Sequence, residues 1–235
     1  MADKNLAPLK FGGVPMVTLN VGLPATIFCI HRDLLCRESP VFSAAFSDGG
    51  HFLEASKIAS SQTMDLVEDD AAAFDQIFNW LYHENLNSGV DKVCPPLRIC
   101  QIYATAEKYG MVNLKNHVVG RIMRTAKNER IIPHLDVVKY VYSTTPSNSP
   151  LRRLFVALYI WHVDKKYWAS RVTSASLSEI PDFAADLAIV LGSKSFGNRM
   201  ERPPEFPGKL EDYHEKPVSM KGQERKESPT AQKLA

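Results

Sequence analysis

The pattern of apolar and polar residues predicts two short strands near the N-terminus. Residues 17–21 alternate between apolar and polar side chains, which is the period of a strand with one buried face. Residues 26–30 are a second run rich in β-branched and aromatic residues, and the glycine and proline of Gly22–Pro24 lie between the two runs. Together they predict a hairpin. A further strand is expected within residues 62–67.

Helical spacing of apolar residues begins directly after the hairpin. One short helix is expected around Leu34, and another after Pro40, because proline is favoured in the first turn of a helix. Three longer amphipathic helices follow, with apolar residues three and four positions apart: Phe74, Ile77, Phe78 and Leu81; Ile99, Ile102, Tyr103 and Ala106; Leu114, Val118 and Ile122. Strands followed by a stack of helices predict an α+β fold.

The second half of the chain has only helical periodicity. Three apolar faces are expected, the last ending at Gly192: Leu135, Val138 and Tyr142; Leu151, Leu154, Phe155 and Leu158; Ile180, Phe183, Ala184, Leu187 and Leu191. From Ser195 onward the periodicity vanishes and polar residues, proline and glycine dominate, which predicts disorder. The expected organisation is an N-terminal tail (1–14), an α+β domain (15–126), a helical extension (127–193) and a disordered tail (194–235).

Composition and charge argue against several classes of partner. The net charge of the 235 residues is +2, with Lys/Arg and Asp/Glu mixed along the chain, whereas a nucleic-acid binder usually carries a basic stripe. The longest apolar runs are too short to span a bilayer, and the N-terminus lacks an apolar core of signal-peptide length. We therefore expect neither direct nucleic-acid binding nor membrane binding, and a location in the cytoplasm, the nucleus or both.

No set of residues predicts catalysis, metal binding or a cofactor. The spacing of Cys29, Cys36, Cys94 and Cys100 matches neither a zinc knuckle nor a disulfide framework, so inert thiols are expected. His31 lies near two of these cysteines, but no glycine motif that could form an oxyanion hole is near. We therefore expect a protein that is not an enzyme.

Four aromatic residues cluster in the extension, namely Tyr159, Trp161, Tyr167 and Trp168. They could form a surface that binds peptides. Aromatic residues at helical spacing more often belong to a core, and this is the interpretation we favour.

The first half contains an ordered set of motifs. The hairpin runs into His31-Arg-Asp-Leu-Leu35 and then Glu38-Ser-Pro-Val-Phe42. Leu81-Tyr82 and Tyr103-Ala-Thr-Ala-Glu-Lys-Tyr109 follow downstream. As a set these motifs, spread over residues 15–125, resemble the BTB/POZ family. The extension is similar to that of BTB proteins of filamentous fungi, through Leu151–Val156, Trp161-His162, Trp168 and Pro181–Ala188.

The resemblance implies a small sheet covered by helical hairpins and an adaptor that binds protein partners and forms a homodimer. It points to His31, Arg32, Leu35, Val41 and Phe42 as self-association residues. BTB transcription factors commonly carry an aspartate just before the first strand, paired with the basic residue after the histidine. Here Met16 stands in that place while Arg32 is present, which weakens the interpretation as a strand-swapped dimer that binds corepressors.

One triplet resembles the binding motif of BTB adaptors of cullin ubiquitin ligases. Those adaptors share an apolar-x-Glu triplet after the second helical hairpin, and Phe52-Leu53-Glu54 stands in that place. The triplet makes a cullin scaffold a candidate partner; the alternative is an ordinary loop. A nuclear scaffold in transcription or chromatin regulation, without a DNA-binding element of its own, is the second functional hypothesis.

Overall fold

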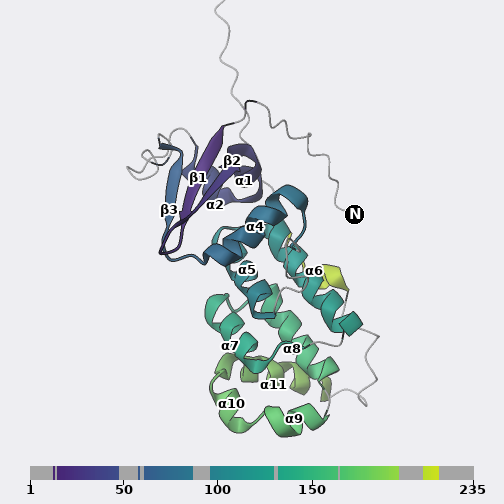
Figure 1. The fold of residues 1–235 in the computed structure, drawn as a ribbon. Helices are drawn as coiled ribbons and strands as arrows, with labels where there is room; N and C mark the ends of the chain where they lie inside the picture. Colours follow the sequence, from purple (N-terminus) through teal and green to yellow (C-terminus); the bar gives the residue numbers. More distant parts are fainter. Residues whose placement is uncertain are drawn as a thin grey trace, which may run out of the picture.

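Among the residues that the structure describes, a three-stranded sheet forms one end and stacked helices follow it (Figure 1). The structure is a computed structural model. It describes residues 13, 15–47, 58, 61–86, 96–129, 132–163, 165–195 and 209–216.

The sheet has the strand order β2-β1-β3, with β1 (Met16–Val21) in the centre. β2 (Thr26–His31) is antiparallel to β1, with Phe28 opposite Leu19, and β3 (Thr63–Leu66) is parallel to β1. The hairpin turn contains Gly22 at φ +80°, a conformation that favours glycine. Alternate residues of β1 are buried, which confirms the predicted strand period.

Two short helices follow the hairpin and meet at Ser39. They are α1 (Arg32–Glu38) and α2 (Pro40–Ala45). The Ser39 hydroxyl accepts a hydrogen bond from the N–H of Phe42 at 3.2 Å and donates one to the carbonyl of Tyr109 at 2.6 Å. This serine therefore caps α2 and also fastens it to a turn seventy residues away.

Three longer helices complete the first half: α4 (Ala71–His83), α5 (Pro96–Lys108) and α6 (Val112–Glu129). α5 lies between α4 and α6. The tight turn between α5 and α6 contains Gly110 at φ +66°. A Cβ atom at this position would lie 2.9 Å from the ring of Pro40, so the glycine allows α2 to approach the turn.

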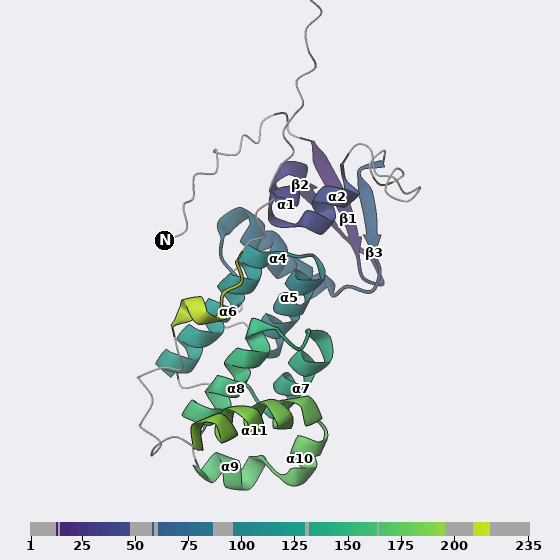
Figure 2. The same ribbon diagram turned by 180° about the vertical axis from the view of Figure 1, so that it is seen from behind.

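The second half consists of helices that continue the stack: α7 (Leu135–Thr144), α8 (Pro150–His162), α9 (Lys165–Arg171), α10 (Ser174–Ser178) and α11 (Pro181–Ser195). α7 packs on α5, and α8 packs on α6. α11 covers α7 and α8 on their far side (Figure 2). One continuous hydrophobic core runs from Val17 in the sheet to Leu187 in α11.

The fold confirms the predicted α+β class and corrects two details. α11 continues through Gly192 to Ser195, although Gly192 was expected to end it. The tail was expected to be disordered from residue 194, but residues 209–216 contain the 3₁₀ helix η1 (Leu210–Tyr213), which packs against α6 and α8. We call residues 209–216 the C-terminal strap.

Candidate interaction sites

An aromatic stack joins the motifs that lie far apart in the sequence. The rings of Phe42 and Tyr109 are stacked with centroids 4.4 Å apart, and Phe74 meets Tyr109 edge-on. The Tyr109 hydroxyl donates to Asp69 at 2.7 Å, and burial followed by this hydrogen bond raises the pKa of Tyr109. These motif residues therefore stabilise the interior of the domain.

His31 at the end of β2 is also anchored. Its Nδ1 lies 2.8 Å from the hydroxyl of Tyr82, and the same hydroxyl receives the backbone N–H of His31 at 3.1 Å. The two rings meet edge-on at a centroid distance of 5.8 Å. This is the hydrogen-bonded histidine of a structural motif, in agreement with its half-buried position.

The structure separates the five predicted self-association residues by exposure. Leu35 and Phe42 are completely buried in the core of their own chain. His31 and Arg32 are half-buried, and Val41 on α2 is 41% exposed. Val41 is therefore the apolar member of the set that a second protomer could contact directly, whereas Leu35 and Phe42 support the surface from beneath.

The outer face of the sheet adds apolar surface at the same end of the molecule. Met16, which stands where BTB transcription factors commonly carry an aspartate, is 43% exposed and pairs in register with His31. Ile27 lies on the same face and is 67% exposed. Asn20 donates a 2.7 Å hydrogen bond to Asp65 and so ties β1 to β3 on this face.

The candidate cullin-binding triplet, Phe52-Leu53-Glu54, lies outside the residues that the structure describes. It therefore stays a prediction.

The four cysteines differ in exposure, and Cys94 lies outside the described residues. Cys29 is exposed, Cys36 is half-buried and Cys100 is buried. Burial is the main cause that raises the pKa of the Cys36 thiol, which makes it a poorer nucleophile.

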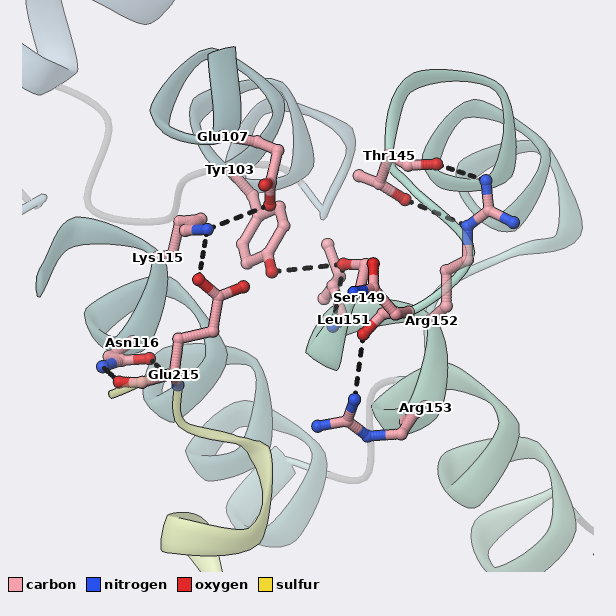
Figure 3. A network of polar contacts seen from close by, with 11 residues as sticks. Tyr103, Glu107, Lys115, Asn116, Thr145, Ser149, Leu151, Arg152, Arg153 and Glu215 are labelled. Atoms are coloured by element: carbon pink, nitrogen blue, oxygen red, sulfur yellow. Dashed lines mark hydrogen bonds and ion pairs between the residues drawn. The ribbon is translucent and has the colours of Figure 1, made fainter. Parts of the chain in front are cut away.

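A polar network crosses the junction between the first half and the extension (Figure 3). The hydroxyl of Tyr103 on α5 lies 3.2 Å from that of Ser149, which also accepts the N–H of Leu151 and so caps α8. Burial raises the pKa of Tyr103. The junction is thus a specific contact with satisfied polar groups, buried in the shared core.

Arg152 on α8 is the second anchor of the extension. Its side chain is 7% exposed and its guanidinium donates to the carbonyls of Tyr142 and Thr145, the first at 2.7 Å. These carbonyls lie at the C-terminal end of α7, where a cation is favoured by the helix dipole. The guanidinium also lies over the Tyr142 ring, 4.5 Å from its centroid.

Two of the four aromatic residues of the extension, Tyr159 and Trp168, have described side chains, and both pack in or against the core. Tyr159 is fully buried and donates a 2.7 Å hydrogen bond to the carbonyl of Pro133. Trp168 meets its ring edge-on at 6.2 Å. The side chains of Trp161 and Tyr167 lie outside the described part.

Within the described residues no group of three or more His, Cys, Asp or Glu side chains is placed to hold a metal ion. None of the described helices combines the length and the apolar character that crossing a membrane requires.

The described residues thus form a small sheet covered by helical hairpins, with exposed apolar side chains at the sheet end. The comparison with family models agrees: residues 16–124 match the BTB/POZ domain. The chain therefore contains a BTB/POZ domain, followed by the helical region α7–α11. No curated protein matches the chain.

Several residues of these contacts gave no signal in the sequence. Arg152 stands beside Arg153 and looks like half of an exposed basic pair, yet only Arg152 is buried. Asn116 and Glu215, which bind each other, are a hundred residues apart in a polar context. Ser39 differs from them in that it belongs to the motif Glu38-Ser-Pro-Val-Phe42, although its bond to Tyr109 has no counterpart in the sequence.

Proposed function

We propose that this chain is an adaptor that forms a homodimer through its BTB/POZ domain and holds a partner protein. The observation that carries the proposal is the distribution of exposed apolar side chains. Of the seven large ones among the described residues, five lie on the sheet, its turns or α2, namely Met16, Leu23, Ile27, Val41 and Val67. Burying such side chains between two copies is the usual driving force of a two-fold dimer.

The experiment is a mass measurement by light scattering over a range of concentrations. The wild-type chain is expected at twice the monomer mass. A Val41→Asp variant is expected to shift to the monomer, because a charge would replace an apolar contact. The matched control is Ile189→Asp, an even more exposed apolar position (68%, against 41% for Val41) on α11 at the other end of the molecule, and it should stay dimeric. A wild-type chain that remains monomeric at about 100 μM, a level at which even weak specific dimers associate, would refute the proposal.

We further propose a cullin-type ubiquitin ligase scaffold as the partner recruited by the dimer. The support is the apolar-x-Glu triplet at residues 52–54, in which an apolar anchor stands beside a carboxylate. Co-purification with a cullin should be lost on Phe52→Ala or Glu54→Lys and retained on Ile189→Ala, at an exposed apolar residue of α11 outside the proposed dimer surface. If the wild-type chain fails to bind a cullin at micromolar concentration, only the general adaptor function stands.

The alternative is a nuclear scaffold in transcription or chromatin regulation. It would use the same dimer and depend on a partner for DNA binding. The two proposals differ in location, since the cullin adaptor can act in the cytoplasm or the nucleus whereas the scaffold requires the nucleus. Exclusion of a tagged full-length chain from nuclei would dispose of the alternative.

A further inference from the structure

The C-terminal strap lies across α6 and α8, far along the chain from both helices (Figures 1 and 2). It follows α11 after residues 196–208 and returns to the first half of the molecule. Its contacts are those of a bound peptide: one main-chain clamp, one charge contact and two apolar anchors.

The clamp is the side chain of Asn116 on α6 (Figure 3). Its Nδ2 donates to the carbonyl of Glu215 at 2.9 Å, and its Oδ1 accepts the N–H of the same residue at 2.8 Å. A single amide therefore satisfies both main-chain groups of one residue. Such a clamp recognises an extended backbone whatever side chain it carries, so it could hold a segment of another protein equally well.

The charge contact is made by Lys115, whose side chain is only 5% exposed. Its ammonium group lies 3.1 Å from Glu107 on α5 and also contacts the carboxylate of Glu215. A buried ammonium needs a counter-charge, and Glu107 supplies one from within the folded domain. The second carboxylate is therefore not required by the core, so Lys115 keeps a partner when the strap leaves.

The apolar anchors are Tyr213, which is 9% exposed, and Leu210. Leu210 lies over Gly120, and a Cβ atom on that glycine would be 3.7 Å from both of its methyl carbons. A glycine inside a helix costs about 1 kcal/mol relative to alanine. Leu210 thus packs against α6 at Gly120, at a distance where a Cβ atom would make only ordinary van der Waals contact.

We propose that Lys115, Asn116, Gly120 and Arg153 form a peptide-recognition site, called here the strap site, for a segment of a partner protein with the pattern Leu-x-x-Tyr-x-Glu that forms one 3₁₀ turn and then continues as extended backbone. The chain's own strap occupies the site through Leu210, Tyr213 and Glu215 and competes with the partner. Arg153 completes the site with a contact of 3.5 Å to the carbonyl of Asp212. This site goes beyond the proposed adaptor function, because it lies away from the sheet end and does not depend on dimer formation.

In the competition between the strap and a partner segment, the strap has the advantage because it is part of the same chain. A tethered segment reaches an effective concentration of the order of millimolar at its site. A partner segment of equal intrinsic affinity therefore meets a site that is mostly occupied by the strap. Its apparent Kd equals its intrinsic Kd divided by the fraction of sites that are open. Release of the strap is expected to raise that affinity by about tenfold or more.

The test uses full-length chains and a fluorescein-labelled peptide with the sequence of residues 209–216, followed by anisotropy. The Tyr213→Ala/Glu215→Ala chain, whose own strap is weakened, should bind the peptide at least tenfold more tightly than the wild-type chain. The single variant Glu215→Ala should fall between them, and it serves if the double variant does not fold. Two altered peptides, with Leu210→Asp and with Glu215→Lys, should bind neither chain.

Three results would overturn the proposal. Equal binding to the wild-type chain and to a folded strap variant would show that the strap does not occupy the site. Equal binding of the altered peptides would show that the site does not read the pattern. A concentration-dependent increase in mass that the free peptide suppresses would mean that the strap of a second copy, and not a partner protein, is the occupant.

Discussion

The side chain of Ser39 carries two roles in one hydroxyl, and Ser39→Ala tests both. The residue is fully buried. The substitution removes the cap of α2, which is worth about 1 kcal/mol. It also removes the donor to the Tyr109 carbonyl, and an orphaned buried acceptor costs about 1–3 kcal/mol. The free energy of unfolding should therefore fall by about 2–4 kcal/mol.

The measurement is urea unfolding, in which a loss of that size lowers the midpoint by about 1 M for an m-value near the upper end of the usual range. Ser47→Ala is the matched control, because Ser47 is exposed and its hydroxyl donates to the nearby carbonyl of Ala44. That variant should change stability by less than about 0.5 kcal/mol. If Ser39→Ala loses no more than the control at unchanged m, the hydroxyl does not fasten α2 to the turn, and the reasoning fails.

Three further variants test other contacts. Gly110→Ala should lower the free energy of unfolding by more than about 1 kcal/mol, because Gly110 has φ +66° and the new Cβ would meet Pro40, which begins α2. Its control is Gly192→Ala, inside α11 with open space around the new Cβ, which should raise the free energy of unfolding by about 0.5–1 kcal/mol. Arg152→Lys keeps the charge but loses the planar fork at the end of α7, so it should cost about 2–3 kcal/mol in urea unfolding, against less than about 1 kcal/mol for the exposed Arg153→Lys. His117 has a pKa lowered below 6.5, first by burial and then by two neighbouring arginines. The unfolded chain therefore binds more protons than the folded chain below about pH 6.5, so stability should fall as the pH drops through that value, and His117→Gln should flatten this part of the urea-midpoint profile.

The sequence predicted the elements of the fold because their signals are local. The alternation in residues 17–21 and the helical spacing after Phe74 are each contained within one element. The position of β3 also followed from its own few residues. The BTB/POZ motifs added the order of these elements, and the aromatic stack of Phe42 with Tyr109 explains why such distant residues occur together.

Exposure could not be predicted in the same way. Helical spacing marks an apolar face but does not tell whether the chain itself or a second copy covers it. Leu35 and Phe42 are covered by their own chain, whereas Val41 is not. The strap gives no local signal because Leu210 and Tyr213 stand among charged residues without periodicity, and the residues it contacts lie 59 to 100 positions away.

The shared core between the BTB/POZ domain and the extension affects how either half can be studied. α7 and α8 cover faces of α5 and α6, and the expected boundary at residues 126–127 falls inside α6. A chain cut there would expose that apolar surface to water, so loss of binding could reflect local unfolding and not the loss of a partner site. We expect the two halves to melt as one cooperative unit. In a dimer joined at the sheet end, this unit would hold the two distal ends at a fixed separation and orientation, so the geometry of whatever binds there would be set by the dimer itself.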